Sequence, residues 1–136
     1  MAGFLLDTNI VSGARKREPA VMRWLAANPS ADTWLSVVTI GELQRGVLLK
    51  RRRDPSAADH LAAWLRRLRA DYESRLIGVD ENTALEWGRI GALRTRGEAD
   101  SLIAATAAIN RLTLVTRNTA DFADTGISLV NPWVDG

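Results

Sequence analysis

Residues 4–9, FLLDTN, place three apolar side chains directly before an acid, a hydroxyl and an amide. A short apolar run of this kind predicts a buried β-strand, here residues 3–7, with Asp7 at its carboxyl end. In open α/β sheets, ligands bind beyond the carboxyl ends of the strands. Asp7 is therefore expected either to cap a helix that follows the strand or to bind a metal ion.

Strands and helices alternate along the rest of the chain. Further strands are predicted at residues 34–38, 75–79, 112–116 and 127–130. Helices are predicted at about residues 9–14, 18–28, 40–52, 57–72, 81–95 and 98–109. This alternation is typical of an α/β domain with a mainly parallel sheet covered on both faces. We expect one α/β/α sandwich, residues 1–136, with a central sheet of four to five strands.

The composition limits the classes of site that the chain can carry. Its 136 residues include no Cys, which excludes disulfides, thiolate metal sites and cysteine nucleophiles and is compatible with a reducing cytosol. No apolar run approaches the roughly 20 residues that span a bilayer, and the N-terminus lacks a signal-peptide pattern. We therefore expect a cytoplasmic protein without membrane contact. The net charge is only +2, but 16 of the 18 basic residues are Arg, which suits either a phosphate-bearing partner or plain solubility.

Three more acids follow predicted strands or open a predicted helix. Glu42 follows the strand at 34–38, Asp121 follows the strand at 112–116, and Asp100 lies in the first turn of the helix at 98–109. If the first strand pairs with the strand at 112–116, at least three acids share one sheet edge. Carboxylates gathered without Lys or His repel each other unless a divalent cation neutralises them. Mg²⁺ or Mn²⁺ prefers oxygen ligands, and such a site typically hydrolyses phosphodiester bonds with an activated water.

Each acid also has a purely structural interpretation. Asp7 could cap a helix, and Glu42 could complete a capping box with Thr39. Asp100 could complement a helix dipole, and Asp121 could stabilise a turn. Taken singly, these interpretations are at least as good as a metal site. Taken together they are weaker, because all four acids fall on the side of the sheet where ligands bind.

Four blocks of the sequence, in order, resemble the PIN-domain ribonucleases, and among these the VapC-type toxins of bacterial toxin–antitoxin pairs. The blocks are LLDTNIVS at residues 5–12, LSVVTIGELQRGV at 35–47, ADSLIAATAAINRLTLVTRNTADF at 99–122 and TGISLVNPW at 125–133. Together they span nearly the whole chain. The resemblance implies a PIN domain and a metal-dependent endoribonuclease that slows translation by cutting RNA.

The resemblance also implies an acidic site that binds Mg²⁺, or Mn²⁺ in its place. Its four metal-binding and catalytic residues are Asp7, Glu42, Asp100 and Asp121. Thr8, Asn9 and Thr116 would orient the carboxylates and bound water, and Asn118 stands where some relatives have an acid.

One segment departs from the family pattern. Relatives usually carry a longer loop before the third acid, whereas this chain has only RTRGEAD at residues 94–100. Glu98 therefore remains an alternative or additional ligand beside Asp100. The short link also leaves open a PIN scaffold with weakened catalysis that acts as a binding module.

The family resemblance further implies an RNA substrate, a homodimer and a VapB-like antitoxin in a bacterial cytoplasm. Such an antitoxin blocks the acidic site and binds operator DNA through its own domain. Arg117, and more weakly Arg15 and Lys16, are candidates for binding the substrate phosphates. Among the Trp residues that could stack on bases, Trp87 falls on an apolar helix face and is expected in the core, and Trp133 is expected to pack the C-terminal tail.

A phosphatase or phosphotransferase with an aspartyl nucleophile is a further alternative. These enzymes usually carry a second acid two residues beyond the first, and a Lys near the last strand. Here the corresponding residue is Asn9, and no Lys follows Lys50. The sequence therefore favours the nuclease.

Overall fold

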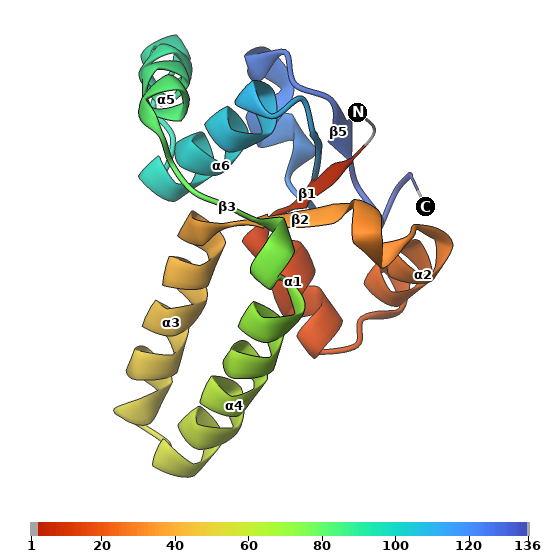
Figure 1. Cartoon of the computed structure of the whole chain (residues 1–136), viewed down its shortest axis with the longest axis vertical. Coiled ribbons are helices and arrows are strands. Elements are labelled where there is room, and N and C mark those ends of the chain that lie inside the picture. The colour runs from red at the N-terminus through yellow and green to blue at the C-terminus, as the bar shows by residue number, and fades with distance from the viewer. Residues whose placement is uncertain (1–2, 136) are drawn as a thin grey trace.

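A five-stranded sheet forms the centre of the molecule. The structure, a computed structural model, describes residues 3–135. The strands are β1 (Phe4–Leu6), β2 (Thr33–Ser36), β3 (Leu76–Ile77), β4 (Thr113–Val115) and β5 (Leu129–Val130). Their order is β3-β2-β1-β4-β5, and every neighbouring pair is parallel (Figure 1). The predicted α/β class and parallel sheet are confirmed.

Within residues 3–135, six α-helices surround this sheet. They are α1 (Thr8–Arg15), α2 (Pro19–Ala27), α3 (Val37–Arg51), α4 (Pro55–Asp71), α5 (Glu81–Leu93) and α6 (Glu98–Ile109). Three 3₁₀ segments connect other elements: η1 (Ser30–Asp32), η2 (Glu73–Arg75) and η3 (Thr119–Thr125). Figure 1 shows α3 and α4 side by side as a hairpin that projects away from the sheet.

The two faces of the sheet are buried by different helices. Leu5 of β1 lies at 0% exposure in a cluster with Ile103 of α6 and Ile90 of α5. Leu6, the next residue, packs on the opposite face with Ile10 of α1 and helix α2. Neighbouring residues of a strand point to opposite faces, so this short apolar run fills both cores. The α/β/α sandwich therefore follows from the strand that precedes Asp7.

Strand β1 pairs with β4, which is the pairing needed for the acids that follow these strands to share one sheet edge. Leu5 stands opposite Leu114, and Leu6 stands opposite Val115. The backbone N–H of Asp7 then donates to the carbonyl of Val115 at 2.9 Å. The carboxyl ends of the two strands consequently lie side by side, and Asp7 meets the segment that follows β4.

Two expectations from the sequence are wrong. Helix α3 begins at Val37, because the Oγ of Ser36 accepts the N–H of Val38 at 3.0 Å and caps the helix. Thr39 is therefore not the cap but a buried residue inside the first turn. Trp87 is 37% exposed rather than part of the core.

Membrane-spanning helices are absent from the described part of the chain. No helix within residues 3–135 combines the length and the apolar character needed to cross a bilayer.

Candidate active site

Asp7 is buried at the junction of β1 and α1. Its Oδ1 accepts the N–H of Thr8 at 2.7 Å, so it does cap α1. Its Oδ2 accepts the hydroxyl of Thr116 at 2.8 Å and the side-chain amide of Asn9 at 3.3 Å. With only 4% of Asp7 exposed, these three donors fix the carboxylate in one orientation. The helix cap and a ligand site are therefore compatible roles for one side chain.

Glu42 is joined to the same junction through Thr8. The hydroxyl of Thr8 donates to Oε1 of Glu42 at 2.7 Å and lies 3.0 Å from the hydroxyl of Thr39. Because α3 begins at Val37, Glu42 lies in the second turn rather than in the first turn that the sequence predicted. Thr8 thus connects the residue that caps α1 to the acid on α3.

Asp100 and Asp121 come from the opposite face of the sheet. Asp100 lies in the first turn of α6, and Asp121 lies on η3. Both line a pocket of about 220 Å³ together with Arg94 and Arg96. Of the two acids in the first turn of α6, Asp100 is the one whose charge acts on Asp7, as described below.

The charges of the acids raise the pKa values of their neighbours. Burial raises the pKa of Asp7 from 3.8 to about 6, and the charges of Asp100 and Glu42 add to this effect. Hydrogen bonds from Thr116 and Thr8 lower the pKa of Asp7 and oppose it. Burial also raises the pKa of Asp100, with further contributions from Glu42 and Asp121. The charges of Asp100 and Glu42 therefore act on Asp7, and the charge of Asp121 acts on Asp100.

The raised pKa of Asp7 predicts an unusual pH dependence of stability in EDTA. The folded protein keeps the Asp7 proton up to about pH 6, whereas an unfolded chain releases it near pH 3.9. Between these values the folded state binds more protons, so the free energy of unfolding falls as pH rises, by up to about 3 kcal/mol. Guanidinium unfolding between pH 5 and 7.5 measures this slope.

The Asp7→Asn variant should flatten that slope, and saturating Mg²⁺ should restore stability to the wild type near pH 7.5. A wild-type stability that rises from pH 5 to 7.5 in EDTA would contradict the assigned shift. The opposite contribution of Asp124, whose pKa is lowered by Arg96, is lost only as pH falls below about 4 and does not mask the effect.

The remaining polar residues of the site link β1 to β4. Asn9 donates to Thr116 Oγ1 at 3.3 Å, and its Oδ1 accepts the backbone N–H of Arg117 at 3.2 Å. Asn118 contributes its backbone N–H to Thr116 Oγ1 at 3.1 Å, while its own residue surface is exposed. Thr8, Asn9 and Thr116 therefore hold the buried carboxylate, and Asn118 holds Thr116.

The three candidate phosphate-binding cations separate into two pockets. Lys16 and Arg117 line a pocket of about 380 Å³ beside Thr8 and Asn9, where the Arg117 guanidinium lies 4.6 Å from the centre of a Trp133 ring. Arg15 instead lines a pocket of about 780 Å³ between α1, α3 and α4. The sequence grouped Arg15 with Lys16, but the end of α1 turns them to different surfaces.

Arg94 and Arg96 were missed by sequence reasoning. Both line the acidic pocket from the link between α5 and α6. In the sequence this link stands out only as a shortened loop. Two Arg residues spaced two apart before Gly97 were the available signal. Basic residues at that spacing are too common on protein surfaces to identify a site by themselves.

The donor set fits a hard divalent cation held largely by water. All the acids that meet at this edge offer oxygen atoms, as Mg²⁺ and Mn²⁺ prefer. Within residues 3–135, no three carboxylate or imidazole side chains stand close enough together to hold an ion jointly. Mg²⁺ commonly keeps several waters and uses one or two carboxylates, so the spacing of these acids suits an ion that is bound partly through water.

The domain's ancestry is shown by comparison with known proteins. A family model described as PIN domain matches residues 4–127. The chain belongs to the PIN-domain family. This PIN domain is 33% identical to toxin FitB of Neisseria gonorrhoeae, over 96% of the chain and 99% of that protein. It superposes on a crystal structure of FitAcB from that bacterium with a TM-score of 0.87, at 30% identity, covering 96% of this chain and 99% of that one.

Two further known proteins are similar to this PIN domain. The VapC ribonuclease Y4jK of Sinorhizobium fredii is 29% identical over 95% of the chain and 96% of that protein. A toxin–antitoxin complex from Klebsiella pneumoniae contains a chain with 26% identity and a TM-score of 0.72, covering 96% of this PIN domain and 98% of that chain. The match extends in each case over nearly the full length of both proteins.

Proposed function

We propose that this PIN domain is the toxin of a toxin–antitoxin pair and acts as a metal-dependent endoribonuclease on RNA. The observation that carries the proposal is the buried carboxylate of Asp7 facing Asp100 and Glu42 at the carboxyl edge of the sheet. Full-length similarity to a protein named VapC ribonuclease and to one named toxin supports both halves of the proposal.

Asp7 and Asp100 are the residues that would bind Mg²⁺ or Mn²⁺ directly. The charge of Asp100 is the strongest charge effect on Asp7, and a cation bound beside both carboxylates would relieve it. Glu42 and Asp121 would hold water molecules of the ion, since no three acids meet closely enough to bind it together. When bound, the ion would polarise the RNA phosphate and lower the pKa of the attacking water.

The protein itself supplies orientation. Thr116 and the N–H of Thr8 hold the Asp7 carboxylate in one orientation, and both bonds lower its pKa, which partly offsets the effect of burial. The hydroxyl of Thr8 holds Glu42 at the same time. A carboxylate fixed before the ion arrives loses little conformational freedom on binding, which favours a small and exacting ion such as Mg²⁺.

The pocket beside Thr8 and Asn9 is the best-placed path for the RNA strand. Lys16 offers a point charge, while Arg117 and Trp133 offer a stacked flat surface for a base next to a phosphate. Asn9 joins this pocket to the site, because it binds both the Asp7 carboxylate and the backbone of Arg117. Lys16 and Arg117 are therefore the proposed phosphate-binding residues, and Arg15 is not.

The double variant Lys16→Gln/Arg117→Gln should weaken RNA binding without changing Mn²⁺ affinity. Each lost phosphate contact should reduce the slope of log affinity against log salt by about 0.7 for single-stranded RNA. Fluorescence anisotropy with an RNA oligonucleotide at several salt concentrations measures the slope. Arg15→Gln is the matched control, and an equal loss of slope in that variant would contradict the assigned path.

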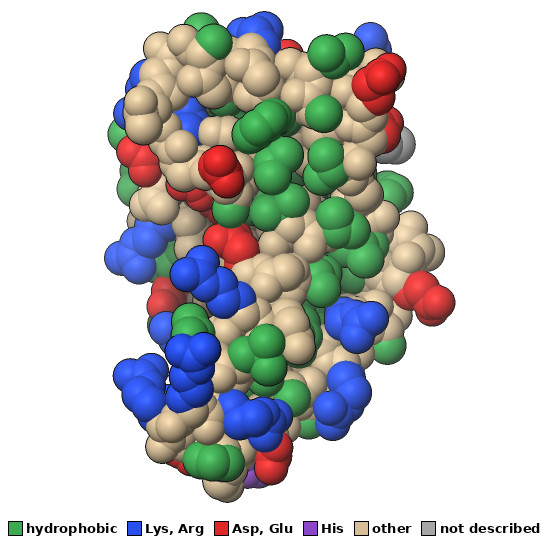
Figure 2. All heavy atoms as spheres, turned by 90° about the vertical axis from the view of Figure 1, so that its left-hand side faces the viewer, with side chains coloured by type: hydrophobic (Ala, Val, Ile, Leu, Met, Phe, Trp, Pro, Cys, Tyr) green, Lys and Arg blue, Asp and Glu red, His purple; other side chains and the backbone are tan. Residues whose placement is uncertain are grey.

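Exposed apolar side chains support assembly with a second protein chain. Leu48 on α3 is 54% exposed and Leu85 on α5 is 69% exposed. Figure 2 shows a band of hydrophobic side chains down the face that carries α3 and α5, beside a group of carboxylates. We assign this band to a homodimer, which the molar mass from light scattering tests. A VapB-like antitoxin that itself binds operator DNA completes the proposed assembly.

Cleavage of RNA by the purified chain is the direct test of the proposed function. We expect products from total bacterial RNA with Mg²⁺ or Mn²⁺, none in EDTA, and none after addition of the antitoxin encoded beside it. Mapping of the cut sites would then identify the RNA target. RNA binding without cleavage at any metal concentration would refute the enzyme and favour a binding module.

A further inference from the structure

Asp121, the fourth acid, lies on the least regular secondary structure in the site. Asp121 lies on η3, which has no side-chain hydrogen bond at its N-cap, Asn118. The side chain of Asp121 is 62% exposed, and its nearest cationic partner is Arg94 at 3.9 Å. By contrast, Asp7 ends a strand, and Glu42 and Asp100 belong to helices. The direction of Asp121 therefore depends on what holds the backbone of η3.

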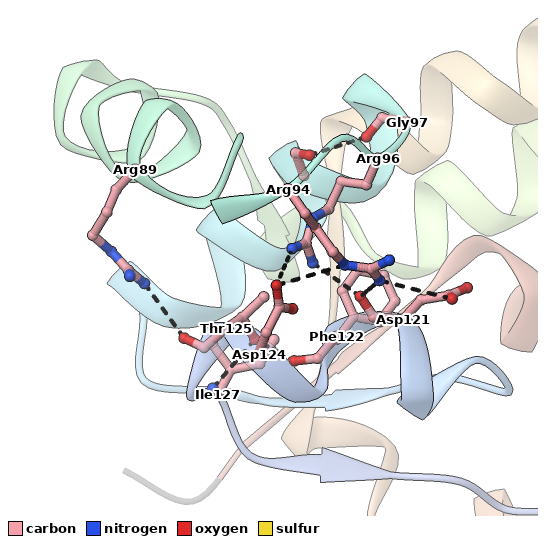
Figure 3. Close-up of polar contacts among 10 residues, drawn as sticks. Arg89, Arg94, Arg96, Gly97, Asp121, Phe122, Asp124, Thr125 and Ile127 are labelled. Carbon is pink, nitrogen blue, oxygen red and sulfur yellow. Dashed lines mark hydrogen bonds and ion pairs between the residues drawn. The ribbon is translucent and has the colours of Figure 1, made fainter. Parts of the chain in front are cut away.

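Two arginines from the link between α5 and α6 hold that backbone. Arg94 donates through Nη2 to the carbonyl of Asp121 at 2.6 Å, and Arg96 donates through Nη1 to the same oxygen at 2.9 Å. Figure 3 shows both guanidinium groups converging on this turn. Hydrogen bonds from charged donors are roughly twice as strong as neutral ones. Here they add to the backbone bonds of η3, such as the 3.0 Å bond from the N–H of Asp121 to the carbonyl of Asn118.

Arg96 forms the inner part of this clamp. Its side chain is only 5% exposed, and its Nη2 donates to Oδ2 of Asp124 at 2.6 Å. One planar group therefore bridges residues 121 and 124 of η3, which Arg94 supports from outside with Nε 3.5 Å from the same carboxylate. A buried guanidinium is stable only where its charge is paired. Moving η3 away would leave Arg96 unpaired, so this position of η3 is strongly favoured.

Arg96 also acts on the acidic centre itself. It lines the 220 Å³ pocket with Asp100 and Asp121. Arg96 therefore lies beside one acid of the site while it fixes the place of another.

We propose that Arg96, assisted by Arg94, is a positioning residue that holds η3 so that Asp121 faces Asp100 and completes the metal site. This inference rests on the proposed function, because it assumes that Asp121 serves the bound ion through its water. Arg89 provides the natural contrast. It is held by Glu86 at 2.7 and 2.8 Å and donates to the carbonyl of Thr125 at 3.3 Å, at the far end of the same segment (Figure 3).

A double-mutant cycle with Mn²⁺ calorimetry tests the coupling. Arg96→Gln should weaken Mn²⁺ binding roughly tenfold, the usual effect of losing a residue that orients a metal site. In an Asp121→Asn background the same substitution should change the affinity by less than about twofold, because the residue it positions is already lost. An equal tenfold loss in both backgrounds would overturn the proposal, as would unchanged affinity in Arg96→Gln.

Further variants separate bridging from charge and from general damage. Arg96→Lys keeps the charge but cannot span both acceptors, so it should not restore the affinity. Asp124→Asn removes the carboxylate at the other end of the bridge, which lies at an exposed position. This variant should also weaken Mn²⁺ binding. Arg89→Gln should leave the affinity within about twofold of the wild type. A wild-type Mn²⁺ affinity in Arg96→Lys would overturn the bridging role of Arg96.

Hydrogen exchange in EDTA gives a readout that needs no metal. Arg96→Gln should accelerate exchange at residues 119–125 at least tenfold relative to Arg89→Gln, while the β1 amides keep their protection. Unchanged exchange at residues 119–125 would overturn the clamp. A wild type that binds no Mn²⁺ would refute the proposed metal site, and exchange would still decide whether Arg96 orders η3.

Discussion

The Asp7→Asn variant is expected to cleave RNA at least about 10³-fold more slowly than the wild type. Residues that merely orient metal ligands already cost 10–100-fold when they are replaced, so loss of a direct ligand should cost more. Asn keeps the size of the side chain and an oxygen that can accept the N–H of Thr8. The substitution therefore removes the negative charge with little change of shape. Initial cleavage rates with Mn²⁺, together with Mn²⁺ affinity, measure the effect.

The matched control is Asp80→Asn. Asp80 caps α5 as Asp7 caps α1, with its Oδ1 accepting the N–H of Thr83 at 2.9 Å. Both variants lose an aspartate at a helix N-cap, but only Asp7 lies at the acidic edge. Asp80→Asn should retain more than half of the wild-type rate. Asp7→Asn retaining above a tenth of the activity would exclude Asp7 as a ligand.

The Phe122→Ala variant is expected to lose about 3–5 kcal/mol of unfolding free energy. Phe122 is 1% exposed and is the largest of the fully buried side chains, packed in one cluster with Leu5, Ile103 and Leu114. Truncation would leave a cavity beneath η3 in addition to the lost transfer energy. Urea denaturation in EDTA, compared with the wild type at the same pH, measures the loss.

The same truncation should also weaken Mn²⁺ binding, because Phe122 anchors the segment between Asp121 and Asp124. Val134→Ala is the control, since Val134 is 78% exposed and its truncation should change stability by no more than about 0.5 kcal/mol. A loss below 1 kcal/mol in Phe122→Ala would show that η3 is not anchored through this ring.

The strands and the position of α6 were predictable because their signals are local. The run FLLD alternates between two cores, and the predicted helix at 98–109 has the bounds observed for α6. The start of α3 was not predictable, because Ser36 and Thr39 are both good N-caps and only the strand register selects Ser36. Sequence patterns thus identify elements better than they identify the residue at which an element begins.

The acids of the site could be proposed from the sequence, whereas their supports could not. Asp7, Glu42 and Asp121 were predicted to follow strands at one sheet edge, with Asp100 joining them if its helix begins there, and in the structure the charges of Asp100 and Glu42 act on Asp7. Their metal-binding roles stay a prediction. The arginine clamp was invisible because it joins a link near residue 95 to a turn near residue 122, a contact set by tertiary structure alone. Arg15 and Lys16 separate for a local reason instead, since successive residues at the end of a helix point about 100° apart.

The position of β1 between β2 and β4 also determines when the site can exist. Thr116 binds Asp7 from 109 residues further along the chain, and Thr113 pairs with Phe4. Contacts between such distant residues form late and slowly during folding. A chain still emerging from the ribosome therefore carries Asp7 without the partners that fix its carboxylate. Any activity of the candidate site is then confined to the completed, folded chain.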